Sequence, residues 1–111
     1  MNPFQVTSTT IEGCVQIQPR VFEDSRGKFV KLFHREAFLE HGLEARYEEE
    51  YYSVSPQSVL RGLHFQIPPM EHVKLVGCVR GVILDVVYDL RKDSPTYGKV
   101  HSQELSAGRA N

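Results

Sequence analysis

The sequence predicts an all-β protein, a sandwich or jelly roll that carries one short helix. Three observations lead to this prediction. Short runs rich in β-branched and aromatic residues recur along the chain, turns rich in glycine and proline separate them, and only residues 35–41 have a helical composition. A βαβ fold needs helices between its strands, and this chain offers a single one.

Length and composition indicate one globular domain. The chain has 111 residues, 41% of them hydrophobic and 24% charged, with a net charge of −1. A balanced charge gives no reason to expect nucleic acid as a partner. No run approaches the roughly 18 apolar residues that span a bilayer, and the N-terminus lacks the pattern of a signal peptide. We therefore expect a cytoplasmic protein that binds no membrane.

The two cysteines do not suggest a disulfide or a zinc site. Cys14 and Cys78 lie far apart in the sequence and form no CxxC or Cys/His pattern. We expect both to be small, buried, apolar side chains.

The first 42 residues predict two strand pairs and the helix. Residues 4–18 suggest two short strands broken at Gly13, one of them at a sheet edge or in an exchanged arm. Residues 23–28 form a polar turn in which Gly27 can take a positive φ, and residues 29–33 continue as an extended apolar run. The helix covers residues 35–41 and ends before Gly42.

Residues 47–55 read as a strand that carries three consecutive glutamates among tyrosines. Alternation sets Glu48 and Glu50 on one face and Glu49 and Tyr51 on the other. A solvated acidic face and a ligand site both fit this run, and the first is the commoner arrangement.

Residues 53–90 suggest two β-hairpins. A strand over residues 58–66 ends at Pro68–Pro69, and strands 73–79 and 82–88 join through Arg80–Gly81. Because both faces of these strands are apolar, we expect sheet packed against sheet. Residues 91–98 are dense in turn formers, and residues 99–105 predict one further strand.

His64 is the strongest candidate for chemistry, since an imidazole exchanges protons near neutral pH. Arg61 and Lys74 are cations that could stabilise an anion formed when His64 acts as a base. The alternative is a histidine that is hydrogen-bonded within a sheet, with Arg61 solvated at a strand end. The pattern alone favours that second interpretation.

Five sequence blocks that occur in a fixed order favour the catalytic interpretation of His64. They are DSRGKF at 24–29, LRGLHFQ at 60–66, KLV at 74–76, GVILDV at 81–86 and DLRKDSPTYG at 89–98. Together they resemble the dTDP-4-dehydrorhamnose 3,5-epimerase family from about residue 17 to residue 105. The resemblance implies a cupin-like jelly roll, a homodimer that exchanges an N-terminal strand, and no metal or organic cofactor. The remaining histidines show no HxH pair or shared ligand spacing.

The resemblance also implies roles for individual residues. His64 matches the general base that removes a proton next to the C4 ketone of the sugar, and Lys74 matches the cation that stabilises the enolate oxygen. Arg26 matches a contact to the diphosphate and Phe29 a contact to the base, although a turn residue and a core aromatic are the structural alternatives. Further substrate contacts are implied for Glu49, Tyr51, Arg61 and Gln66.

Two departures from the family pattern bear on this expectation. The family is longer, and its later part supplies a tyrosine acid and an aspartate that orients the base, so we expect residues 1–111 to be a single, partial domain. Lys31 stands where the family tends to have glutamate, and residues 49–51 replace a stretch rich in Gln, Asp and Asn. These changes bear on the choice of nucleotide base.

The expected function is 3,5-epimerisation of a nucleotide-linked 4-keto-6-deoxy sugar of the dTDP-linked type, in deoxysugar synthesis for the cell envelope. Two alternatives stay open. One is a related ketoisomerase or single-site epimerase, and the other is a catalytically silent module for nucleotide-sugar binding or dimerisation.

Overall fold

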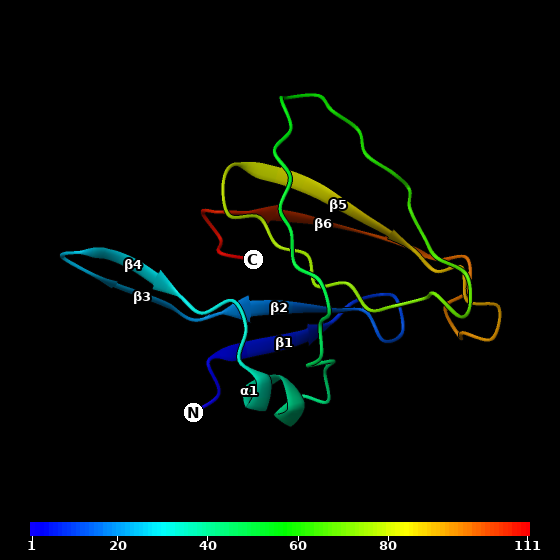
Figure 1. The fold of residues 1–111 in the computed structure, drawn as a ribbon, viewed down its shortest axis with the longest axis horizontal. Coiled ribbons are helices and arrows are strands. Elements are labelled where there is room, and N and C mark those ends of the chain that lie inside the picture. The colour runs from blue at the N-terminus through cyan, green and yellow to red at the C-terminus, as the bar shows by residue number, and fades with distance from the viewer.

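Three β-hairpins and one short helix make up the computed structural model, which describes residues 1–111. The strands are β1 (Phe4–Ser8), β2 (Val15–Pro19), β3 (Val21–Asp24), β4 (Gly27–Val30), β5 (Val82–Tyr88) and β6 (Val100–Ser106), and the helix is α1 (Arg35–Glu40). Each hairpin is a separate two-stranded antiparallel sheet (Figure 1). The prediction of an all-β protein with one short helix is therefore confirmed.

The N-terminal hairpin and the helix share the only hydrophobic core cluster. Phe4 of β1 and Ala37 and Phe38 of α1 are buried, and Phe38 has no exposed surface. The Phe4 and Phe38 rings meet edge to face with their centroids 5.0 Å apart. Asn2 adds a polar tie by donating to the Ala37 carbonyl oxygen over 2.9 Å. The helix ends where Gly42 takes a φ of 68°, as predicted.

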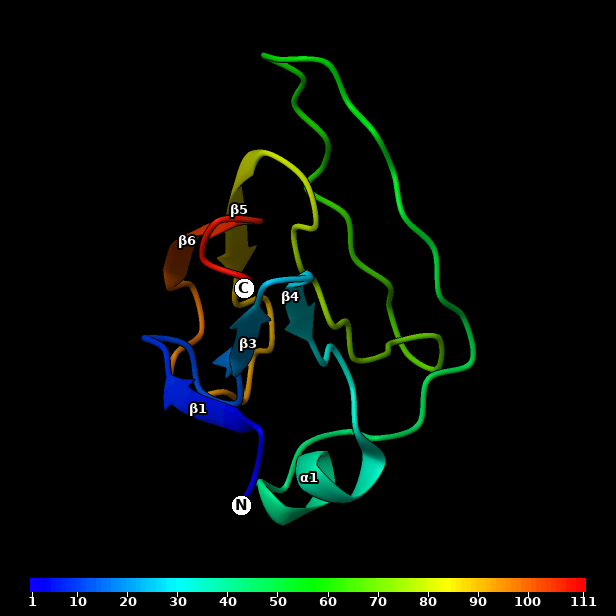
Figure 2. The same cartoon turned by 90° about the vertical axis from the view of Figure 1, so that its left-hand side faces the viewer.

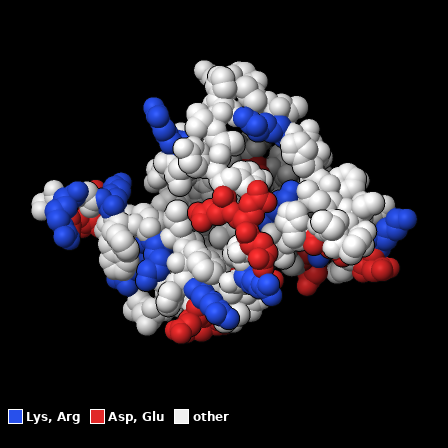
Figure 3. Space-filling model, viewed as in Figure 1, with Lys and Arg blue, Asp and Glu red and all other residues white.

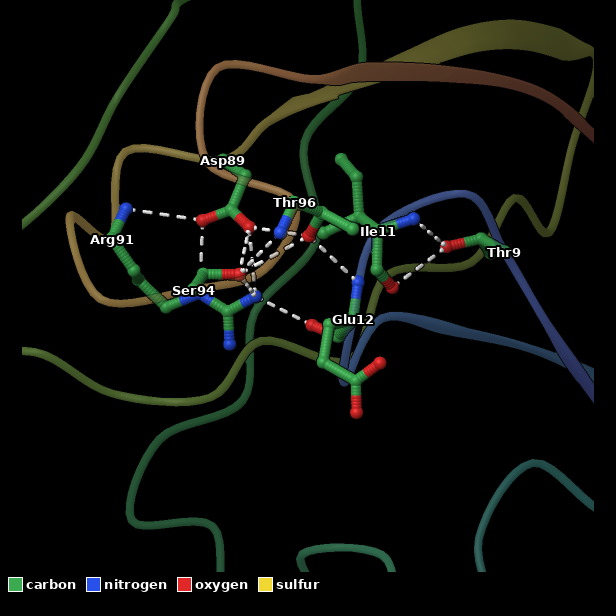
Figure 4. A network of polar contacts seen from close by, with 7 residues as sticks. All are labelled: Thr9, Ile11, Glu12, Asp89, Arg91, Ser94 and Thr96. Carbon is green, nitrogen blue, oxygen red and sulfur yellow. Dashed lines mark hydrogen bonds and ion pairs between the residues drawn. The ribbon is translucent and has the colours of Figure 1, made fainter.

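The loop between β5 and β6 is fastened to the loop between β1 and β2 by the carboxylate of Asp89, whose side chain is fully buried. Ser94 and Thr96 donate to its Oδ2 from 2.6 and 2.7 Å, and Arg91 bridges both carboxylate oxygens (Figure 4). Arg91 also donates to the Glu12 carbonyl oxygen, and the Glu12 amide donates to Thr96. Two loops about 80 residues apart in sequence are thus held together.

Asn111 closes the other end of the β5–β6 hairpin. Its Oδ1 accepts from the Ser106 amide over 2.9 Å, and its Nδ2 donates to the Glu104 carbonyl oxygen over 3.2 Å. The Cys78 amide donates to the backbone oxygen of Asn111 over 3.1 Å. Cys78 is buried and Cys14 half-buried, and both thiols are free. The expectation of two buried cysteines is thus confirmed for Cys78 only.

The strands predicted at 47–55, 58–66 and 73–79 are not formed. These residues follow an irregular path from α1 to β5 (Figures 1 and 2), and β5 pairs with β6 rather than with residues 73–79. A strand exists only where a second strand satisfies its backbone N–H and C=O groups, and these segments have no such neighbour. The predicted packing of sheet on sheet is absent for the same reason.

The accessible surface and the radius of gyration show that much of the chain is not packed against other residues. The accessible surface is 9440 Å², against about 6,200 Å² for a compact monomer of this mass. The radius of gyration is 15.2 Å, against about 13 Å for a compact chain of this length. Only 10 of 111 residues are buried. The residues with proposed functional roles therefore lie on an open framework.

Candidate active site

His64 lies on the exposed, irregular segment that precedes Pro68. Two residues earlier, Gly62 has a φ of 104°, and a Cβ atom there would lie 3.5 Å from the His64 amide nitrogen and 4.0 Å from its Nδ1. Glycine is the residue that adopts this φ without strain, so a larger residue at position 62 would strain the backbone next to His64. No hydrogen bond involves the His64 ring, which is therefore open to water or to a ligand.

Arg61 is tied to the preceding segment. Its Nε donates to the Ser55 hydroxyl over 2.8 Å, which leaves the terminal nitrogens of the guanidinium unpaired. Ser55 thus holds the Nε of Arg61, while the two terminal guanidinium nitrogens, which suit phosphate oxygens, stay accessible. Lys74 and Gln66 are also exposed, and neither forms a side-chain hydrogen bond.

Arg26 is engaged within its own turn. Its Nε and Nη2 reach the Asp24 carboxylate, with the shorter contact at 2.6 Å. The hydrogen bond from Arg26 lowers the pKa of Asp24, and the same bond raises the pKa of Arg26. The Arg26 side chain is 88% exposed, so a competing anion can reach it. The geometry is that of the surface turn residue weighed above.

Phe29 is exposed rather than a core aromatic. Its ring is 62% exposed and lies on β4, with its centroid 6.5 Å from that of Phe22. Both rings line a groove of about 570 Å³ that runs between the β3–β4 hairpin, the N-terminus and α1. Lys31 and His34 line the same groove. The lysine that stands where the family tends to have glutamate is therefore close to Phe29.

The glutamates at 48–50 are exposed, and Arg46 pairs with Glu48 over 2.6 Å. Figure 3 shows acidic side chains gathered in the middle of the face along which the chain runs after α1. Tyr51 beside them is 79% exposed. The acidic run is thus solvated, although the strand expected to carry it is not formed.

The predicted site residues fall into two groups in this structure. Arg26 and Phe29 sit on the β3–β4 hairpin, which points away from the segment carrying Arg61 and His64 (Figure 1). The chain does not bring these groups together. No group of three or more His, Cys, Asp or Glu side chains is arranged to hold a metal ion. No helix has the length and apolar character needed to cross a membrane.

The Asp89 cluster is the feature that reasoning from the sequence missed. The block DLRKDSPTYG enters the sequence analysis as a turn and as part of the family resemblance, with no role for the Asp89 side chain. The signal was present, because an aspartate followed closely by Arg, Ser and Thr can receive several local hydrogen bonds at once.

Comparisons with known proteins agree with the sequence blocks. The family model described as dTDP-4-dehydrorhamnose 3,5-epimerase matches residues 8–111. The dTDP-4-dehydrorhamnose 3,5-epimerase of Methanothermobacter thermautotrophicus is 43% identical over 106 residues, which are 96% of this chain and 57% of that protein. The dTDP-4-dehydrorhamnose 3-epimerase of Streptomyces niveus is 45% identical over 89 residues, or 79% of this chain and 43% of that protein.

A crystal structure shows the same backbone arrangement. It is the dTDP-4-dehydrorhamnose 3,5-epimerase of Bacillus anthracis with TDP and PPi bound, and it is 32% identical to this chain with a TM-score of 0.91. The match covers 96% of this chain and 62% of the solved one. The fold is therefore the cupin-like fold of these epimerases, and the chain spans less than two thirds of the length of the relatives it matches.

Proposed function

This chain belongs to the dTDP-4-dehydrorhamnose 3,5-epimerase family, and on that basis we propose that it acts in the 3,5-epimerisation of a dTDP-linked 4-keto-6-deoxy sugar. The reaction serves deoxysugar synthesis in this proposal. The observation that carries it is the LRGLHFQ block within the matched range, where the His64 imidazole is open to solvent.

The chemistry starts with proton removal. His64 takes the proton from the sugar carbon beside the C4 ketone, and the electron pair of the broken C–H bond delocalises onto the ketone oxygen. The ammonium of Lys74 stabilises the negative charge that develops on that oxygen more than it stabilises the neutral ketone. The barrier to proton removal is therefore lowered. A proton from solvent, delivered to the opposite face of the enolate, completes an epimerisation and restores the ketone, and His64 releases the abstracted proton to solvent.

Substrate binding divides between the two groups of residues. Arg61, with Glu49, Tyr51 and Gln66 nearby in sequence, contacts the sugar nucleotide around His64. Arg26 serves the diphosphate and Phe29 the base. Because the β3–β4 hairpin points away from His64 within one chain, these two residues reach a substrate in a second subunit. A homodimer with an exchanged N-terminal strand fits this arrangement.

Solvent isotope exchange tests the proposal. The protein is incubated with dTDP-4-keto-6-deoxyglucose in heavy water, and deuterium is followed at C3 and C5 by NMR. We expect incorporation by the wild type, and a loss of at least about 100-fold in His64→Ala, the typical contribution of a general base. His72→Ala is the matched control, because His72 is exposed and bonds only to the Met70 carbonyl oxygen nearby. Equal exchange in both variants would refute the role of His64.

Two observations favour alternative functions. The absence of any hydrogen bond to the His64 ring leaves its tautomer unselected, which favours a catalytically silent module for nucleotide-sugar binding or dimerisation. The name of the Streptomyces niveus relative favours a single-site epimerase. Binding without exchange supports the first alternative, and deuterium at C3 alone supports the second.

We also propose that the protein works in the cytoplasm. The two free thiols, at Cys14 and Cys78, suit a reducing compartment.

A further inference from the structure

One face of the β3–β4 hairpin carries two exposed aromatic rings. Phe22 and Phe29 are paired across the hairpin, and they are 47% and 62% exposed. The guanidinium of Arg20 lies 4.9 Å from the centroid of the Phe22 ring and covers part of it. The Phe29 ring is therefore the more open of the two for a flat ligand.

Lys31 lies on the same side of the hairpin as Phe29. It follows Phe29 by two residues, and both side chains line the groove of about 570 Å³. Lys31 is half-buried, and its ammonium forms no ion pair and no hydrogen bond. The carboxylate of Glu40, which lines the same groove, accepts from Asn2 over 2.8 Å. The groove thus offers an unpaired donor beside an open ring.

The order of residues along the hairpin determines which edge of a bound base meets Lys31. Arg26 lies in the turn, Phe29 lies on β4, and Lys31 lies roughly 6.6 Å further along the extended chain. This inference rests on the proposed function, in which Arg26 serves the diphosphate and Phe29 the base. A nucleotide laid in that direction has its sugar toward the turn. Because N1 of a pyrimidine carries the sugar, the opposite edge, at C4, points toward Lys31.

Stacking on Phe29 does not choose between bases, since every base has an aromatic face. A polar group at the edge of the base can choose. The Lys31 ammonium has three N–H donors and no acceptor. At C4, thymine and uracil carry a carbonyl oxygen that accepts, whereas cytosine carries an amino group that donates. We propose that Lys31 is a specificity-determining residue, which donates to the C4 carbonyl of thymine or uracil and excludes nucleotides of cytosine.

Calorimetric titration of the 111-residue chain with dTDP, dUDP and dCDP tests this role. We expect dTDP to bind about tenfold more tightly than dCDP, the scale of one hydrogen bond to a charged group. We expect dUDP to bind within about fourfold of dTDP, because the two differ by a single methyl group. The diphosphate is common to all three ligands, so its attraction to the lysine cancels in these ratios.

A matched pair of variants assigns the preference to one side chain. Lys31→Met keeps the apolar stem and removes the donor, and we expect it to abolish the preference for dTDP over dCDP. Lys28→Met removes the same charge from the opposite face of the hairpin, where Lys28 lies 3.9 Å from Glu23. We expect this control to keep the tenfold preference.

Four results would each overturn the role of Lys31. They are equal affinity for dTDP and dCDP, a preference that survives in Lys31→Met, dUDP binding as weakly as dCDP, and tighter binding of dCDP. The last result would assign the selecting contact to Glu36, an acceptor that lines the groove from α1.

Failure of this inference and failure of the proposed function give different results. A chain that prefers dTDP but incorporates no deuterium would refute the proposed catalysis and leave the role of Lys31 intact. Deuterium incorporation with equal affinity for dTDP and dCDP would refute the role of Lys31 alone. If none of the three nucleotides binds, both the inference and the nucleotide site on which it rests are refuted.

Discussion

The Arg91 guanidinium donates two hydrogen bonds to the Asp89 carboxylate, from Nε to Oδ1 over 2.9 Å and from Nη2 to Oδ2 over 3.0 Å. The carboxylate is fully buried while the guanidinium is 57% exposed, so the pair sits at the boundary between the loop and the solvent. Because Arg91 also donates to the Glu12 carbonyl oxygen, the pair helps to hold the β5–β6 loop against the N-terminal hairpin, together with the hydrogen bond from the Glu12 amide to Thr96.

We expect Asp89→Asn to lower the melting temperature by roughly 5 °C or more, the scale of one lost interaction in a domain of this size. The amide cannot accept from Ser94, Thr96 and Arg91 as the carboxylate does. Differential scanning fluorimetry measures the change. Asp24→Asn is the control, because the Asp24–Arg26 pair is exposed on both sides and its loss should shift the melting temperature little.

The same carboxylate makes the stability pH-dependent. The hydrogen bond from Arg91 holds the pKa of Asp89 well below its usual range, with smaller help from Ser94 and Thr96. A lowered folded-state pKa means that the contribution is complete above the unfolded value of about 3.9 and is lost as the pH falls below it. Urea denaturation at pH 7, 4 and 3 should show a drop below pH 4 that is smaller in Asp89→Asn. Equal drops in both proteins would contradict this assignment.

Phe38→Ala should remove most of the N-terminal core. The Phe38 side chain has no exposed surface and contacts the rings of Phe4 and Phe33. We expect a cost of about 3–5 kcal/mol in the free energy of unfolding, measured by urea denaturation. Phe65→Ala removes a ring that is 65% exposed, and it should cost no more than about 0.5 kcal/mol.

Asn111→Ala should expose the Cys78 thiol. Loss of the bonds to Ser106 and Glu104 releases the segment whose backbone oxygen accepts from the Cys78 amide. We expect Cys78 to react with a thiol reagent about fivefold faster, the equivalent of one net hydrogen bond. Cys14 serves as the internal control, since its reaction rate should not change. Mass spectrometry distinguishes the two sites.

Ser55→Ala should weaken binding of the nucleotide diphosphate by about 2- to 10-fold, since Arg61 then loses the hydrogen bond that holds its Nε. Calorimetric titration with dTDP measures the effect. Ser53→Ala removes another exposed hydroxyl, one that forms no hydrogen bond, and it should leave the affinity unchanged. An equal loss in both variants would mean that Ser55 does not position Arg61.

Local chemistry made part of the fold predictable. The helix was found from its composition and from Gly42, and the turn at 23–28 was found from Gly27, which indeed has a φ of 116°. The strands at residues 58–66 and 73–79 were predicted wrongly, because alternation describes a residue's preference and not the presence of a neighbour. Pairing is a property of the whole sheet, and no strand lies beside these segments in the structure.

The candidate site divides in the same way. Blocks of sequence identified His64, Lys74 and Arg61 as a group, and the structure exposes all three on the path between α1 and β5. They did not reveal that Arg26 forms an ion pair with Asp24, two residues earlier. This ion pair competes with any ligand of the Arg26 guanidinium. Nor did they reveal Asp89, whose role depends on Glu12, at the other end of the chain.

The hairpins close over short stretches of chain, which has a consequence for biosynthesis. Both strands of the first lie within residues 4–19, and the core they form with α1 is complete by Ala45. Loop closure over such distances takes well under a millisecond, whereas a ribosome adds about 5–20 residues each second. All residues of the N-terminal core are therefore synthesised before the Asp89 loop, and the first hairpin has time to close before that loop exists.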